Sequence, residues 1–449
     1  MFARKVCSLD DECASMNTKC RVLEASASAS RPARTMCLSP ADKLLDRFYR
    51  TMISAEKYLD VTSLSMPSGV FRPAFINALT VLDQKATPPT VRILLSGEEV
   101  LNINPRQPAQ EALEKIWTEM RKAGNLGETI RMHINMGYVS RNFNWNHSKI
   151  IIADKQRMLQ GGHNMWGDPY LISRPVSDLS MEVYGPIVGA SQSFVDSLWA
   201  ENVRLKTENL LGGAFFGSLP KGSGEIANPL VPTAASGSIP MIAVGRMGTF
   251  GPNPSDDASK AMIRSAKYSI DFIVQDLYGL LSNVKIKDIQ ILEAKPWAFD
   301  EIAEALMRGV HLRVIQSDTD VGVNDYTLFK FYNAQKLLIS NVVQYAKEKR
   351  FKAPGGQSPQ AYFCSLVQYA PIRYVADQTR WDKQKGYGSH AKLLIVDDAA
   401  FYVGSHNYYT ANLQEFGVIV ADQALTRQLQ KAYWEPIWNV SQHSVAQCN

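Results

Sequence analysis

The pattern His-x-Lys-x4-Asp occurs twice in this chain of 449 residues, beginning at His147 and again at His390. In each copy the residues between the Lys and the Asp are apolar β-formers. A turn with glycine at its start begins seven residues after each Asp, at 161–164 and at 404–407. A single short motif often matches by accident. Two copies with matching tails predict two versions of one structural unit.

The residue types in each copy suit phosphoryl transfer. A His and a Lys two residues apart on a strand are expected on the same face. Imidazole can exchange a proton or attack an electrophile near neutral pH, and an ammonium group binds phosphate oxygens. The glycines let backbone approach closely, and the turn Asn can donate to an anion. Two facing copies would form one pocket that needs no metal and no cofactor, built from His147, His390, Lys149, Lys392, Asn164 and Asn407. A purely structural interpretation, two buried strands with satisfied histidines, fits a single copy better than a duplicated one.

The two copies resemble the signature of the phospholipase D superfamily. The residues that follow them resemble the corresponding segments of secreted actinomycete phospholipases D. After the first copy these residues are 175–178, 184–186, Phe194 and Trp199, and after the second they are 398–405 and 413–417. The resemblance is strong over about 140–205 and 360–440, weaker from about 40, and does not cover the first 37 residues.

The resemblance implies an α/β fold of two similar lobes, each a mixed β-sheet flanked by helices, packed about a pseudo-twofold axis. It implies that His147 attacks phosphorus and forms a phosphohistidine, while His390 protonates the leaving alcohol and then activates water. The residues alone leave the order of the two histidines open. The resemblance also places a carboxylate beside each histidine, at Asp178 and Glu415. We expect Glu415 beside His390, where Glu departs from the Asp of the secreted enzymes and its extra methylene alters the pairing.

Other residues have supporting roles in this interpretation. Asp154 and Asp397 lie five residues after the motif lysines, on the opposite face of a strand, so we expect them to be structural. Gly162 and Ser405 belong to the turns. Further predictions concern Trp166 and Tyr326 as candidates for lining a lipid path, with core packing the alternative for Trp166, and His406 as a surface histidine.

These observations favour a phospholipase D that hydrolyses the distal phosphodiester of glycerophospholipids to phosphatidic acid and free alcohol, with transfer to alcohols. The alternatives are a phosphatidyltransferase or synthase of the same superfamily, and a nuclease. A nuclease should show dense basic residues near the site, but 141–170 holds only Arg141, Lys149, Lys155 and Arg157, and the net charge is only +5. We therefore expect a phospholipid substrate at a membrane or micelle surface, no nucleic acid, and a monomer.

The order of predicted elements also repeats. Helices are expected at 39–52, 71–82, 109–123, 258–266 and 299–308, with strands at 58–63, 91–95, 130–135, 149–152, 268–273 and 312–316. Asp60 aligns with Asp271, and Arg92 aligns with Arg313. The offset between the halves grows along the chain, which predicts insertions in the second half around 318–387. The predicted organisation is a Cys-containing, poorly ordered arm at 1–37, lobes at 38–211 and 241–449, and a linker at 212–240.

The cysteines bear on the compartment. Four of the six, Cys7, Cys13, Cys20 and Cys37, lie in the first 37 residues, and their number and clustering suggest disulfides and a secreted or extracytoplasmic protein. Free thiols in a flexible arm are the alternative. Residues 1–20 hold no apolar core of a secretory signal, and no apolar run is long enough to span a bilayer, so we expect no transmembrane segment.

Overall fold

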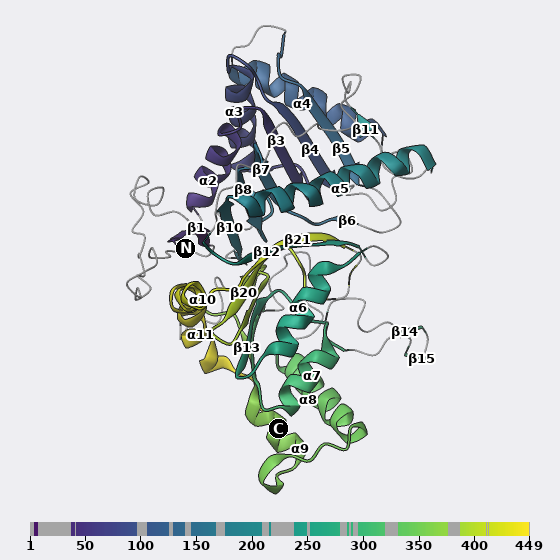
Figure 1. Ribbon diagram of the computed structural model, residues 1–449, viewed down its shortest axis with the longest axis vertical. Coiled ribbons are helices and arrows are strands. Elements are labelled where there is room, and N and C mark those ends of the chain that lie inside the picture. Colours follow the sequence, from purple (N-terminus) through teal and green to yellow (C-terminus); the bar gives the residue numbers. More distant parts are fainter. Residues whose placement is uncertain are drawn as a thin grey trace.

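The computed structural model describes most of the chain. The described residues are 4–7, 37–40, 42–96, 106–124, 129–139, 145–167, 176–208, 215–216, 238–248, 252–278, 285–286, 289–290, 295–318, 331–375, 387–409, 411 and 413–448. Figure 1 shows two α/β lobes, one above the other, each with a mixed sheet and flanking helices. The predicted linker lies mostly outside the described residues, as does most of the predicted arm, so the proposed domain boundaries remain predictions.

The two sheets repeat one strand order. The first contains β5 (Ile134–Val139), β4 (Thr90–Ser96), β3 (Tyr58–Ser63), β7 (Ile150–Ala153), β8 (Arg157–Gly161) and β10 (Leu179–Tyr184). The second contains β17 (Val367–Pro371), β16 (His311–Gln316), β13 (Ser269–Val274), β19 (Leu393–Val396), β20 (Ala400–Gly404) and β21 (Leu413–Val420). In both, the first three strands are parallel to each other and the rest pair antiparallel. The expected pair of similar α/β lobes is confirmed.

The sheets differ at the strand beyond this shared set. In the first lobe β1 (Arg4–Cys7) runs parallel to β10, and β2 (Cys37–Pro40) pairs with β1. In the second lobe β12 (Met241–Met247) runs antiparallel to β21. The two half-sites therefore have different neighbours at the same position. Shorter strands are β6 (Trp145–Asn146), β9 (Val176–Ser177), β11 (Phe215–Phe216), β14 (Lys285–Ile286), β15 (Ile289–Gln290) and β18 (Gly388–Ser389).

Helices cover the outer face of each sheet. The first lobe has α2 (Asp42–Ile53), α3 (Phe71–Asp83) and α4 (Arg106–Gly124), and the second has α6 (Pro254–Ser265), α7 (Phe299–Met307), α8 (Phe331–Glu348) and α9 (Pro359–Leu366). Both α8 and α9 fall in the predicted insertion. The long α5 (Pro186–Glu208) crosses between the lobes in Figure 1, and α10 (Gln423–Leu429) and α11 (Glu435–Ser441) follow the last strand.

The inner faces of the two sheets share one apolar core. Ile150 and Ile152 of β7 pack in the same cluster as Leu393 and Ile395 of β19, whereas Ile151 faces the helices of its own lobe. Apolar residues on both faces explain why each motif strand is a continuous apolar run. The motifs are thus held on buried strands that meet at the lobe interface.

The aligned charged residues form the same pair in each lobe. Arg92 donates two hydrogen bonds to Asp60, at 2.6 and 2.7 Å, and Arg313 donates two to Asp271 at the same distances. Each pair joins directly opposed residues on neighbouring parallel strands. The repeat inferred from these four residues is therefore present in three dimensions.

The motif aspartates are structural, as expected, but not for the expected reason. Asp154 lies after the end of β7, with a φ of 52°, and Asp397 after β19 has a φ of 51°. The Asp154 carboxylate accepts from three consecutive N–H groups, those of residues 56–58, at 2.7–2.8 Å. Asp397 accepts likewise from residues 267–269. Each aspartate caps a turn and ties the chain entering the sheet to the motif strand.

Several element boundaries differ from the sequence-based expectation. Ser39 and Pro40 do not cap a helix, because they belong to β2 and α2 begins at Asp42. The strand expected at 130–135 is β5 at Ile134–Val139. Pairing with β4 sets this register, which local propensity does not encode.

A disulfide joins Cys364 of α9 to Cys448 near the C-terminus. Cys7 lies opposite Cys37 in the β1–β2 register. Within the described part of the chain, no helix is both long and apolar enough to cross a membrane.

Candidate active site

Each motif stretch docks on the opposite lobe before it enters its own sheet. β6, just before His147, pairs with the start of β21, and the His147 N–H donates to the Gln414 carbonyl at 2.8 Å. β18, just before His390, pairs with β9, and the His390 N–H donates to the Ser177 carbonyl at 2.7 Å. The residue after each accepting carbonyl is a carboxylate, Glu415 or Asp178. The backbone therefore places each motif histidine beside an acid from the other lobe.

The histidine–carboxylate pairs are crossed between the lobes. His390 Nδ1 donates to Asp178 Oδ2 at 2.7 Å, and His147 Nδ1 donates to Glu415 Oε1 at 3.0 Å. The expectation that Glu415 lies beside His390 is wrong. The segment that follows each motif turn lies beside the other motif's histidine, so Asp178 pairs with His390 and Glu415 pairs with His147.

The two imidazoles are buried and lie close together, the edge of one toward the face of the other. Their ring centroids lie 6.2 Å apart with the planes inclined at 69°. Because Nδ1 of each ring donates to a carboxylate, the lone pair of the neutral ring lies on Nε2, which is the nitrogen that can attack or accept a proton. A phosphorus atom between two such nitrogens could be attacked from one side while its leaving group is protonated from the other.

The motif lysines fold back onto their own histidines. Lys149 Nζ donates to the His147 carbonyl at 2.7 Å, and Lys392 Nζ donates to the His390 carbonyl. His147 and Lys149 precede β7, and His390 and Lys392 precede β19, so neither pair lies within a strand. The expected strand placement was wrong, but both lysines are buried beside the histidines.

The glycine turns bring the asparagines to the site. Asn164 and Asn407 are both buried. The Asn407 N–H donates to Glu415 Oε1 at 2.9 Å, and its side-chain Nδ2 donates to the Tyr409 hydroxyl at 2.7 Å. A Cβ on Gly162 would collide with the Asp178 carboxylate, so the first turn needs glycine. Ser405, in the equivalent turn, instead accepts from the Phe416 N–H at 3.0 Å.

Burial and the lysines favour the neutral form of both histidines. Burial and the Lys149 ammonium lower the pKa of His147 to about 3, although Glu415 opposes the shift. Burial and both lysines hold the pKa of His390 well below its usual value. Burial lowers the pKa of Lys392 to about 8 and that of Lys149 well below its usual range. A neutral imidazole is the form that can act as a nucleophile.

The two carboxylates differ in charge environment. Burial raises the pKa of Asp178. Burial acts in the same sense on Glu415, but the Arg246 guanidinium and the hydrogen bond from His147 outweigh it and lower its pKa to about 2. Glu415 is therefore the more firmly ionised of the two acids.

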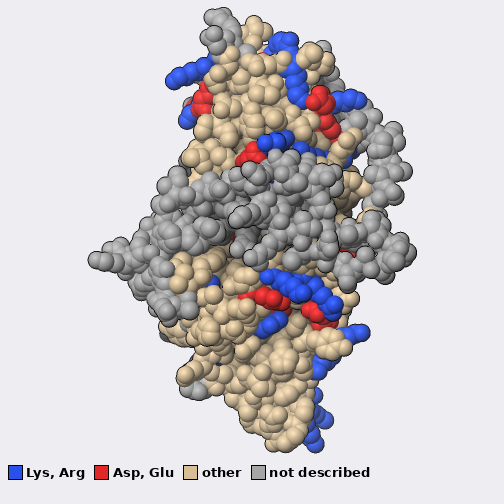
Figure 2. Space-filling view, turned by 90° about the vertical axis from the view of Figure 1, so that its left-hand side faces the viewer, with Lys and Arg blue, Asp and Glu red and all other residues tan. Residues whose placement is uncertain are grey.

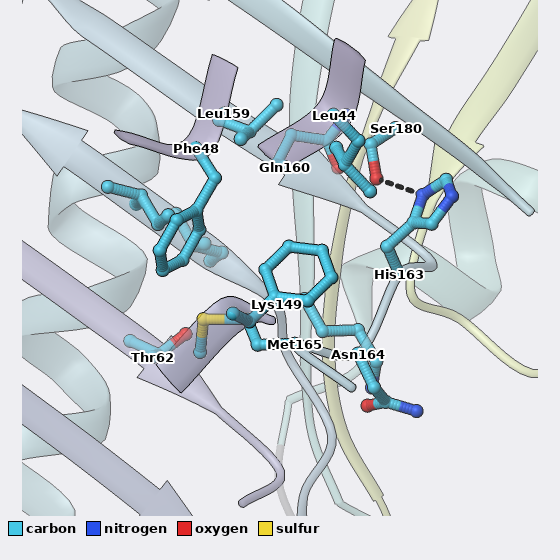
Figure 3. A pocket seen from close by; sticks show the side chains of 13 residues that line it. Leu44, Phe48, Thr62, Lys149, Leu159, Gln160, His163, Asn164, Met165 and Ser180 are labelled. Carbon is cyan, nitrogen blue, oxygen red and sulfur yellow. Dashed lines mark hydrogen bonds between the residues drawn. The ribbon is translucent and has the colours of Figure 1, made fainter. Parts of the chain in front are cut away.

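A small cavity opens beside the first half-site (Figure 3). It has a volume of about 30 Å³, and its apolar lining includes Leu44, Phe48 and Phe71. Lys149 and Asn164 line it on the other side, near the hydrogen bond between His163 and Ser180. A cavity of this size has room for about two water molecules.

The remaining predicted residues have different outcomes. Trp166 is half-buried, and its Nε1 donates to the Ser65 hydroxyl at 2.7 Å, so at least one edge packs in the first lobe. Tyr326 lies outside the described residues. His406 is fully buried rather than on the surface, because Trp297 and Tyr408 pack around its ring. The sequence analysis missed Arg246, since nothing in its local sequence marks a contact with a residue on β21.

The chain is similar to known proteins over most of its length. Residues 260–438 match the family model described as "Cardiolipin synthase, PLD-like domain". A phospholipase D of Streptomyces antibioticus is 28% identical over an alignment that covers 90% of this chain and 78% of that protein. The chain belongs to the phospholipase D superfamily. Both matches support a phosphodiesterase or phosphotransferase activity for this chain. A phosphatidylserine synthase from Haemophilus influenzae Rd KW20 has a similar fold, with a TM-score of 0.55 at 14% identity over 90% of this chain and 85% of that one.

Proposed function

We propose that this protein is a phospholipase D that cleaves the distal phosphodiester of glycerophospholipids and can pass the phosphatidyl group to water or to an alcohol. The observation that carries the proposal is the close pair of buried imidazoles, each held through Nδ1 by a carboxylate of the other lobe. The Streptomyces antibioticus relative, which bears the name phospholipase D, supports the same reaction.

In the first step His147 Nε2 attacks phosphorus, an N–P bond forms, and the P–O bond to the head group breaks. His390 gives its proton to the departing oxygen. An anionic phosphodiester that enters between two buried lysines supplies the negative charge that raises the pKa of His390, so this histidine can carry the proton. Lys149, Lys392, Asn164 and Asn407 hold the non-bridging oxygens, where charge develops.

In the second step His390, now neutral, takes a proton from water or an alcohol. The oxygen of that molecule attacks phosphorus and the N–P bond to His147 breaks. The Asp178 carboxylate stabilises the protonated form of His390. The Glu415 carboxylate stabilises the positive charge on the phosphorylated His147. Asp178 and Glu415 are both committed to histidines, and within the described part of the chain no cluster of His, Cys, Asp and Glu is suited to a metal ion.

A phosphatidyltransferase is the second candidate, because the matching family model carries the description of a cardiolipin synthase domain. The two reactions share the first step and differ in the acceptor. A nuclease finds less support. On the face shown in Figure 2, basic and acidic residues are intermixed among the described residues, whereas a nucleic-acid surface favours a continuous basic stripe.

The test is a head-group release assay on several phospholipids, with a DNA digestion control and with ethanol at a few per cent. Phosphatidic acid in water and phosphatidylethanol in ethanol support the proposal. Product only with a complex alcohol such as a glycerolipid, and none with water, would favour the phosphatidyltransferase. DNA cleavage without lipid turnover would refute both lipid functions. Activity on a soluble short-chain substrate should survive EDTA, since the lysines supply the positive charge.

A further inference from the structure

The two half-sites are not equivalent at the strand that flanks their carboxylates. Beside Glu415 runs β12, and Arg246 lies directly opposite Glu415 in the antiparallel register. Opposed residues on one face of an antiparallel pair are close enough to interact. Beside Asp178 runs β1 instead, whose described residues begin opposite Leu179. Among the residues whose side chains the structure describes, no arginine contacts the Asp178 carboxylate.

Arg246 is a buried clamp behind the His147 half-site. Its Nη2 forms an ion pair with Glu415 Oε2 at 3.3 Å and donates to the Ala411 carbonyl at 2.7 Å. Its Nε donates to the Leu413 carbonyl at 3.2 Å. These contacts hold the guanidinium against the segment that leads into β21. The positive charge of Arg246 is therefore kept beside Glu415.

The other end of the guanidinium is held by the second motif turn. Nη1 donates to His406 Nε2 at 2.8 Å, and since arginine is always a donor, the His406 proton lies on Nδ1, where it meets the Ser255 hydroxyl at 2.7 Å. Asp256 Oδ1 lies 3.4 Å from Nη1. The buried His406 thus belongs to the support of Arg246.

Glu415 itself is fully buried, so it stays ionised only if nearby cations offset the cost of burial. The charged and titratable groups that face it are Arg246 from β12, His147, Lys149 and Lys392 from the motif stretches, and His406 and Tyr402 near the second turn. His147 and the two lysines change charge or partners during the proposed reaction cycle. Arg246 alone among these groups keeps a constant positive charge.

We propose that Arg246 is a positioning residue that keeps Glu415 ionised and directed at Nδ1 of His147, and so keeps Nε2 of His147 ready to attack. This inference rests on the proposed function for its kinetic consequence, although the contact itself does not. The longer glutamate arm needs such a clamp, because its carboxylate has one more rotatable bond than that of Asp178. Because the Arg246 charge is constant, Glu415 stays ionised and His147 stays in the orientation that the nucleophile needs.

The experiment compares Arg246→Met, which removes the charge, with Arg246→Lys, which keeps the charge but lacks the several N–H donors of the guanidinium. The control is Arg47→Met, since Arg47 is another buried arginine, paired with Glu182 at 3.2 Å in the first lobe. In each variant the ring nitrogens of His147 are followed against pH by ¹⁵N NMR, with the signal assigned through His147→Asn. Thermal unfolding of each variant monitors folding. The pH profile of kcat/KM is measured on a soluble short-chain phosphodiester.

Loss of Arg246 should raise the pKa of Glu415. The ¹⁵N shift of His147 Nδ1 changes when Glu415 is protonated, so this change should move to higher pH. We expect a shift of about one pH unit or more in Arg246→Met, a smaller shift in Arg246→Lys, and none in Arg47→Met. The acidic limb of kcat/KM should move by the same amount, and kcat at neutral pH should fall about tenfold.

An unchanged His147 titration in a folded Arg246→Met protein would overturn the inference. Failure of both variants to fold while Arg47→Met folds would also overturn it, because Arg246 would then serve the fold and not the site. If the parent cleaves no phosphodiester, the proposed function fails, and the NMR titration still decides the role of Arg246.

Discussion

His390 of the second lobe donates its Nδ1 proton to Asp178 of the first lobe, 212 positions earlier in the chain. His147 and Glu415 form the reciprocal pair. Each lobe therefore supplies a histidine to one half-site and an acid to the other. Neither lobe holds a complete histidine–carboxylate pair by itself, so the site depends on the packing of the two lobes.

The crossed pairs should separate the two chemical roles. In Asp178→Asn the amide cannot stabilise a protonated His390, so leaving-group protonation should suffer. A substrate with a nitrophenol leaving group needs no proton, and its burst of nitrophenol should recover to near the parental rate in Asp178→Asn. Glu415→Gln should stay slow with both substrates, because it impairs the nucleophile. Rescue of Glu415→Gln and not of Asp178→Asn, measured by stopped-flow absorbance, would reverse the roles of the histidines.

Replacement of either motif histidine should abolish turnover. His147→Asn and His390→Asn should each lose at least about 100-fold in kcat, and the double variant should lose little more, because the residues act in one coupled reaction. Circular dichroism and the thermal midpoint serve as controls for folding. A single variant that retains more than about a tenth of the parental activity would contradict a two-histidine mechanism.

Gly162→Ala should damage the His390 half-site without a change in any polar group. The new methyl group would meet the Asp178 carboxylate and push it from His390. We expect kcat to fall at least about tenfold, because a hydrogen bond to a charged group is lost. Gly189→Ala in α5 is the matched control, since a Cβ there meets nothing within 4 Å. Equal kcat values for the two variants would show that the Gly162 turn has room to adjust.

The Lys392 charge should set an alkaline limit on kcat/KM. Burial lowers the pKa of Lys392 to about 8, so the ammonium is present below this pH and is lost as the pH rises through it. We expect kcat/KM to decline above about pH 8, since this ratio reports the free enzyme. Lys392→Arg keeps its charge and should remove this limb, although its maximum should be lower. A limb of the same midpoint in Lys392→Arg would assign it to another group.

The Cys364–Cys448 disulfide should stabilise the second lobe. It closes a loop with a sequence separation of 84, for which chain entropy predicts a loss of roughly 4 kcal/mol on removal. Cys364→Ser should therefore lower the free energy of unfolding in guanidinium, with kcat unchanged below the transition. Reduction of the parent by dithiothreitol should have the same effect, and Cys364→Ser should not respond to the reductant at this bond. Equal stability of parent and variant would indicate that the bond does not form.

Much of the architecture could be predicted from the sequence because the chain repeats itself. The paired Asp60–Arg92 and Asp271–Arg313 residues gave the alignment of the two halves, and the structure repeats both contacts in the same geometry. The apolar runs after Lys149 and Lys392 identified strands that are buried on both faces. Such local patterns report periodicity and residue type, which determine elements and their burial.

The sequence by itself determined which residues would meet: two histidines, two lysines, two asparagines and two acids. Only the tertiary structure decided which acid lies beside which histidine, because that depends on β9 and β21 pairing with the motif stretch of the opposite lobe. The structure likewise decided that Arg246 lies opposite Glu415 and that His406 is buried. Those contacts join residues more than a hundred positions apart through strand register, and register is a property of the whole sheet that no local pattern specifies.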